Sequence, residues 1–121
     1  MLKIINDLPG NILGIEGEGE VTGSDYETVL IPAVEEKLKT NKKIRLLYHL
    51  GKNFTGFDLK AMIDDADIGL KDLTDWERIA LVSDHEVINI FSKFFGYLLS
   101  GKVKIFQDSG YEAAKKWIAE K

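Results

Sequence analysis

Residues 76–86 read Trp-Glu-Arg-Ile-Ala-Leu-Val-Ser-Asp-His-Glu, a strand-like apolar run that leads into the start of a helical pattern. The apolar part, Ile79 to Val82, is nearly continuous, which is typical of a strand covered on both faces. Ser83 and Glu86 then have the spacing of a capping box. In such a box the hydroxyl accepts a hydrogen bond from an amide of the first helical turn, and the acid suits the positive end of the helix dipole. The stretch therefore predicts a buried strand followed by a helix.

The same spacing of a hydroxyl and an acid recurs elsewhere in the chain, each time just before a helical pattern. The other boxes are Thr22/Asp25, Thr55/Asp58 and Ser109/Glu112. Three of the four boxes follow a strand-like run, so the chain is interpreted as repeated strand-to-helix units. Units of this kind favour parallel strands joined by helical crossovers.

The rest of the chain completes an α/β pattern. A hairpin is expected at the N-terminus, with strands at about 2–5 and 12–20 joined by a type II turn at 8–11. Further strands are expected at 44–50, 76–82 and 103–106, and helices at about 24–39, 56–70, 84–100 and 111–119, with Pro32 expected to kink the first. We therefore predict a single domain over residues 1–121, with a four- or five-stranded mixed sheet, an N-terminal hairpin followed by parallel strands, and about four helices.

The composition of the chain excludes some classes of function. The chain has 121 residues, a net charge of −4 and no cysteine. An acidic chain argues against nucleic acid as a partner, and the absence of cysteine excludes disulfides and thiol chemistry. Neither a secretory signal nor an apolar stretch of about 20 residues is present, so cytoplasmic residence is the expectation, with peripheral contact at the inner face of a membrane left open.

The third expected helix carries an unusual excess of apolar side chains. Its apolar residues cover an arc of about 200° at about 100° per residue, roughly twice the width that packing on one sheet face requires. They are Val87, Ile88, Ile90, Phe91, Phe94, Phe95, Tyr97, Leu98 and Leu99. The second helix has a milder excess, with Phe57, Ala61 and Ile68 opposite its core stripe.

Two interpretations of this excess remain open. The surplus surface is either covered by a neighbouring helix or a homodimer partner, or it forms an apolar ligand pocket or a membrane-contacting surface. A lipid-like or apolar small ligand suits the pattern better than membrane docking alone, because interfacial helices usually carry several basic residues. The candidate residues for this surface are Phe57, Ile68, Phe91, Phe95 and Tyr97.

No catalytic constellation, metal site or cofactor site is found. His49 and His85 have no metal-ligand spacing to another His or Cys, and both are interpreted as structural or solvent-facing. The acids between Asp64 and Asp67 lack the glycine and terminal Glu of a calcium loop. Glycines at 14, 17 and 19 alternate with glutamates that would repel a phosphate.

Thr55 has a second interpretation besides helix capping, as a regulatory site. It lies at the expected start of a helix that follows a central strand, where open sheets of this class commonly present ligands and switches. A phosphate there would be favoured by the helix dipole and opposed by the nearby Asp58.

The pattern resembles the SpoIIAA-like family of the STAS group, the sulphate transporters and anti-sigma factor antagonists. The resemblance spans nearly the whole chain, and its most specific parts are 75–84, 103–106 and 112–118. It implies a non-enzymatic module with a mixed sheet and helices that shift to open an apolar cavity or to meet a membrane. In anti-sigma antagonists a phosphorylatable Ser precedes a Gly and an apolar residue; Thr55-Gly56-Phe57 stands in a similar position, after a Gly-Lys-Asn-Phe stretch that departs from the usual approach.

The sequence thus predicts a non-enzymatic module that binds an apolar or lipid-like ligand, a membrane surface or a protein partner through its second and third helices. The alternative is a phospho-regulated partner-switching protein that acts through Thr55. An enzyme with an unrecognised site is a third hypothesis.

Overall fold

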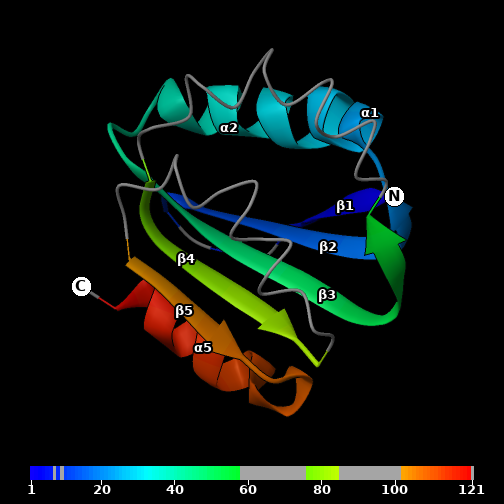
Figure 1. Cartoon of the computed structure of the whole chain (residues 1–121). Helices are drawn as coiled ribbons and strands as arrows, with labels where there is room; N and C mark the ends of the chain where they lie inside the picture. The colour runs from blue at the N-terminus through cyan, green and yellow to red at the C-terminus, as the bar shows by residue number, and fades with distance from the viewer. Residues whose placement is uncertain (7, 9, 58–75, 85–101, 121) are drawn as a thin grey trace.

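The computed structural model describes residues 1–6, 8, 10–57, 76–84 and 102–120 (Figure 1). The expected helices at 56–70 and 84–100 therefore lie almost wholly outside the described residues. Within the described part, no helix is long and apolar enough to cross a membrane.

A five-stranded mixed sheet forms the centre of the fold, with the strands in sequence order. The strands are β1 (Leu2–Ile5), β2 (Ile12–Val21), β3 (Ile44–Phe57), β4 (Trp76–Ser83) and β5 (Lys102–Phe106). β1 and β2 are antiparallel, and each later neighbouring pair is parallel. The predicted hairpin followed by parallel strands is confirmed, and Gly10 in the hairpin turn has the positive φ of 63° that a type II turn requires.

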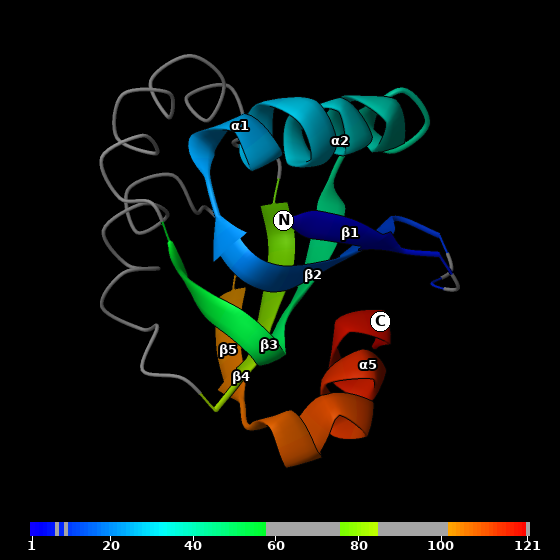
Figure 2. The same ribbon diagram turned by 90° about the vertical axis from the view of Figure 1, so that its right-hand side faces the viewer.

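Helices cover the two faces of this sheet. The helical segment of α1 (Gly23–Asp25), η1 (Tyr26–Leu30) and α2 (Ile31–Leu38) lies over one face, and α5 (Tyr111–Ala119) lies against the other (Figures 1 and 2). Side chains that alternate along β3 belong to different cores: Leu46 packs on the α2 side and Leu47 on the α5 side, and neither is exposed to solvent. The apolar run Leu46 to Tyr48, like Ile79 to Val82, predicts a strand covered on both faces, and the burial of both runs confirms this.

Pro32 changes the helical geometry ahead of it. Proline has no backbone N–H, so the usual bond to the residue four positions earlier cannot form. The preceding turn widens into a π-helix over Tyr26–Leu30, in which the N–H of Ile31 donates to the carbonyl of Tyr26. The helical spacing of this segment predicts an inward stripe of Tyr26, Leu30, Val34 and Leu38; the first three are buried, and Leu38 is partly buried against the same core.

α5 is fixed to the sheet at its carboxyl end by two arginines. Arg78 donates to the carbonyl of Trp117 over 2.8 Å, and Arg45 donates to those of Ile118, over 2.8 Å, and Glu120. The last carbonyls of a helix have no partner inside it and attract cations, so these contacts stabilise the end of α5.

The capping boxes have different outcomes. The Thr22/Asp25 box forms in both directions: the Thr22 Oγ1 accepts from the Asp25 N–H over 3.3 Å, and the Asp25 carboxylate accepts from the Thr22 N–H over 2.8 Å. The predicted cap at Ser109 is wrong. Ser109 lies inside a 3-10 turn, η3 (Asp108–Gly110). The N-cap residue of α5 is Gly110, which has no side chain with which to cap the helix.

Paired substitutions should separate these two boxes. Thr22→Ala is expected to lower the free energy of unfolding by about 1 kcal/mol, because it removes a formed cap. Ser109→Ala is expected to change it by less than about 0.5 kcal/mol, since the residue is exposed and caps no helix. Urea unfolding curves of both variants measure the difference, and equal losses would contradict the assignment of the caps.

Candidate functional site

The candidate residues from the sequence fall into three groups. Ile68, Phe91, Phe95 and Tyr97 lie outside the described residues. Phe57 is the last residue of β3, and its backbone is paired in register with Val21 of β2. Thr55 is exposed on the same stretch of β3. The structure therefore brings Thr55 and Phe57 onto one strand end.

The predicted start of a helix at Gly56 is wrong, and with it the placement of Thr55 at a helix mouth. β3 pairs with β4 up to Leu50, and its residues 51–57 continue beside β2. The continuation needs irregular register, and glycines supply it: Gly19 has φ +58° and Gly56 has φ +150°. Phe54, which is 4% exposed, fixes the extension in the core.

The carboxyl ends of the parallel strands carry a connected polar cluster. His49 of β3, Val82 of β4 and Phe106 of β5 are register neighbours, so the strand ends meet at one edge of the sheet. The Nε2 of His49 lies 2.5 Å from Oδ1 of Asp108, which follows β5. The N–H of Asp108 donates over 2.9 Å to Oδ1 of Asp84, which follows β4. One hydrogen-bonded chain thus links the ends of three strands.

The Tyr111 ring completes this cluster. It lies with its centroid 4.8 Å from that of the His49 imidazole, at an interplanar angle of 43°. His49 and Asp108 are both largely buried, with 19% and 21% of their side chains exposed. The sequence left His49 as either structural or solvent-facing. The structure favours the structural role, because the His49 side chain links β3 to the start of α5.

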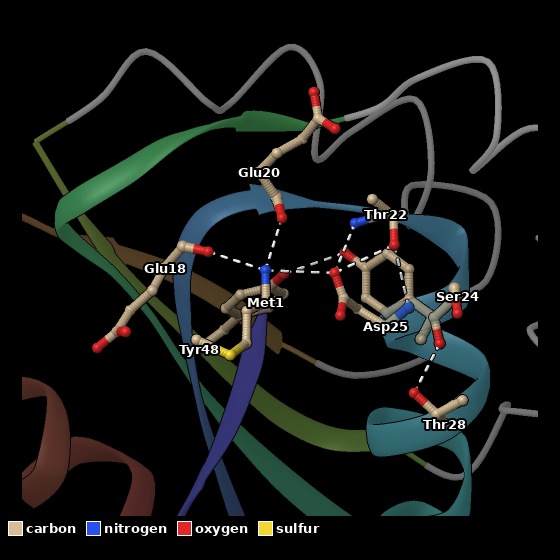
Figure 3. Close-up of polar contacts among 9 residues, drawn as sticks. Met1, Glu18, Glu20, Thr22, Ser24, Asp25, Thr28 and Tyr48 are labelled. Atoms are coloured by element: carbon tan, nitrogen blue, oxygen red, sulfur yellow. Dashed lines mark hydrogen bonds and ion pairs between the residues drawn. The ribbon is translucent and has the colours of Figure 1, made fainter.

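A second polar cluster lies where β1 and α1 meet (Figure 3). The N-terminal ammonium donates to the carbonyls of Glu18 and Glu20 over 2.8 and 2.6 Å, and it lies 3.3 Å from the Asp25 carboxylate. Burial alone would raise the pKa of Asp25, but the hydrogen bonds from Thr22 and the positive charge of the ammonium outweigh it and hold that pKa below its ordinary value.

Beneath that cluster two tyrosines meet in the core. The hydroxyls of Tyr26 and Tyr48 are 3.1 Å apart and buried. Burial raises the pKa of both phenols, and the nearby Asp25 carboxylate adds to the effect. Both tyrosines therefore stay neutral at physiological pH, which fits a structural hydrogen bond between η1 and β3 and gives no sign of proton transfer.

Within the described residues, no group of three or more His, Cys, Asp or Glu side chains could hold a metal ion. Sequence reasoning missed the contact between His49 and Asp108, which are 59 positions apart. The available signal was positional: His49, Asp84 and Asp108 each lie near the end of one of three expected parallel strands, where sheets of this class gather polar groups.

Comparisons with known proteins agree with this architecture. The sequence model of a family described as SpoIIAA-like matches residues 12–119. A solved structure of an uncharacterized protein from Shewanella loihica PV-4, of the DUF3478 family and with a SpoIIAA-like fold, is 25% identical, with a TM-score of 0.68. The match covers 98% of this chain and 93% of that one. No curated protein sequence matches the chain.

Proposed function

Since the chain belongs to the SpoIIAA-like family, we propose that it is a non-enzymatic binding module that holds an apolar or lipid-like ligand through the segments that join β3 to β4 and β4 to β5. Family membership supports a binding or partner-interaction module. The ligand class is argued from the residues of this chain.

The observation that carries the proposal is the apolar excess between Val87 and Leu99. Nine of its 13 residues are apolar or aromatic, and at helical spacing they cover about twice the arc that one sheet face can hide. Surplus apolar surface of this kind marks a ligand site, a membrane contact or a protein interface. Phe91, Phe95 and Tyr97, with Phe57 and Ile68 from the preceding connection, are the proposed contacts.

The sheet also has apolar surface outside its buried core. Val103 and Ile105 of β5 are 41% and 45% exposed. They are in register with Ile79 and Leu81 of β4, which belong to the core on the α2 side. The apolar face of the sheet therefore extends past the buried core to the edge strand, and a ligand on this side would find apolar surface there.

The charge of the protein favours a ligand over membrane docking. A net charge of −4 opposes attraction to anionic lipid surfaces, and Lys93 is the single Lys or Arg in the stretch 85–100. Membrane docking is therefore tested as the alternative to an enclosed lipid-like ligand.

Phospho-regulation through Thr55 is the second candidate, and one observation favours it. Thr55 is exposed on the extension of β3, so a kinase could reach its hydroxyl without opening the core. A phosphate there would add charge next to the connection that begins at residue 58.

Mass spectrometry of the protein purified without detergent separates these candidates. We expect a native spectrum with an extra mass that is lost on denaturation and that yields a lipid-like compound on solvent extraction. A phosphate mass on Thr55 would favour partner switching instead. If no compound co-purifies and the delipidated protein takes up no fluorescent fatty acid, the ligand proposal is wrong, and flotation with neutral and anionic vesicles then tests membrane docking.

A further inference from the structure

A hollow at the carboxyl edge of the sheet has no role in the function proposed above. It is open to solvent, has a volume of about 270 Å³ and is lined by Leu50, Gly51 and Lys52 of β3, with Asp84 and Asp108 at the ends of β4 and β5. Open α/β sheets bind ligands at this edge, outside the carboxyl ends of parallel strands.

The side chains on one side of the hollow are held in place. The Asp108 carboxylate is fixed by its 2.5 Å contact with His49, and Asp84 is fixed by accepting the Asp108 N–H over 2.9 Å. Each of these contacts uses Oδ1, so within the described part of the chain Oδ2 of both aspartates is left for another donor. Two preorganised acceptors favour a cationic nitrogen with several N–H groups.

Lys52 brings the opposite charge to the same hollow. Its side chain is exposed, and in the part of the chain that the structure describes its ammonium makes no ion pair. A ligand that carried only a positive charge would leave this ammonium repelling it. A ligand with an anionic group on one side and an ammonium on the other would satisfy Lys52 and the two aspartates together.

We propose that this hollow binds a small zwitterion, a molecule with an ammonium group a few bonds away from an anionic group. The ammonium donates to Asp84 and Asp108, the anionic group accepts from Lys52, and any apolar part rests on Leu50. The volume equals that of about nine water molecules, so the part of the ligand that lies in the hollow is about the size of an amino acid. Free amino acids and the phosphoethanolamine headgroup of a lipid share this chemistry.

The test is an NMR titration of the whole chain, followed at the amides of Gly51, Asp84 and Asp108. The probes are L-alanine, L-leucine, L-glutamate and O-phosphoethanolamine, and we expect saturable shifts with dissociation constants of about 0.1–1 mM for at least one. Blocking its ammonium by acetylation, or its anionic group by amidation or esterification, should weaken binding at least about tenfold. Tighter binding of O-phosphoethanolamine than of every amino acid would identify a headgroup as the source.

Variants of the lining residues complete the test. Asp84→Asn keeps an oxygen for the Asp108 N–H and so preserves the hollow, and it should weaken binding at least about tenfold, as should Lys52→Met. Glu112→Gln, exposed on α5, is the matched control and should bind normally. No saturable shift at about 10 mM of any probe, or equal binding of acetylated compounds, overturns the inference. Either result leaves the proposal of an apolar ligand site intact, because the two proposed sites share no residue.

Discussion

Leu46→Ala and Leu47→Ala are each expected to lower the free energy of unfolding by about 2–5 kcal/mol. The two residues are consecutive in β3, and neither is exposed to solvent. Leu46 lies in the core beneath the helical segment Gly23–Leu38, whereas Leu47 lies in the core beneath α5. A strand with one solvated face would tolerate one of the two changes, so similar losses at both positions are the signature of a sheet covered on both sides.

Urea unfolding measured by circular dichroism checks this expectation. Lys43→Ala is the matched control, because Lys43 precedes the same strand and is exposed, and its effect should stay within about 0.5 kcal/mol. A loss at Leu47 as small as the control would mean that α5 does not cover the sheet in solution. The same result at Leu46 would contradict the packing of the first helical segment.

Much of this fold follows from local patterns. The near-continuous apolar runs in β3 and β4 predict burial on both faces, and the structure has it. The periodicity of residues 111–119 predicts an amphipathic helix with Ala113, Ala114, Trp117 and Ile118 inward. α5 has those bounds, with Ala114 and Ile118 buried and Trp117 partly buried, whereas Ala113 is exposed. Such features are encoded by neighbouring residues, and so they can be inferred without knowing the tertiary contacts.

Where prediction failed, a contact distant in sequence determined the outcome. The Thr55 box suggests a helix start, but pairing with β2 keeps the chain extended to Phe57, through glycines whose positive φ a local pattern does not reveal. Ser109 has the spacing of a cap, but the chain enters the 3-10 turn at Asp108, whose N–H donates to Asp84, the residue after the neighbouring strand β4. In both cases non-local hydrogen bonds override local propensity.

The two candidate sites differ in how much of each can be predicted from the sequence. An apolar excess is visible from residue spacing, because it is a property of one segment, and it yielded Phe91, Phe95 and Tyr97 as candidates. The polar cluster of His49, Asp84 and Asp108 is a property of three strand ends that meet, so it needs the sheet order before it can be recognised. The two sites also call for different chemistry, apolar contact in one and charge pairing in the other.

Phe95→Ser is expected to weaken binding of the apolar ligand at least about tenfold if Phe95 lines the site, because truncating a buried aromatic contact removes more than about 1.4 kcal/mol of binding free energy. Asn89→Ser is the matched control, since at helical spacing Asn89 falls on the polar remainder of the same segment. Uptake of a fluorescent fatty acid by the delipidated variants measures binding, and thermal unfolding measures stability alongside it.

The combination of the two measurements distinguishes a binding residue from a core residue. A surface or pocket residue should lose ligand uptake while the unfolding midpoint stays within a few degrees of the parent, since stability changes of about 1 kcal/mol shift it by several degrees in a domain of this size. Phe95 in the core would instead lower the midpoint strongly, because replacing a buried phenylalanine by a much smaller residue costs about 3–5 kcal/mol. Normal uptake by a stable variant would remove Phe95 from the site, and a strongly destabilised one would assign the apolar excess to packing within the fold.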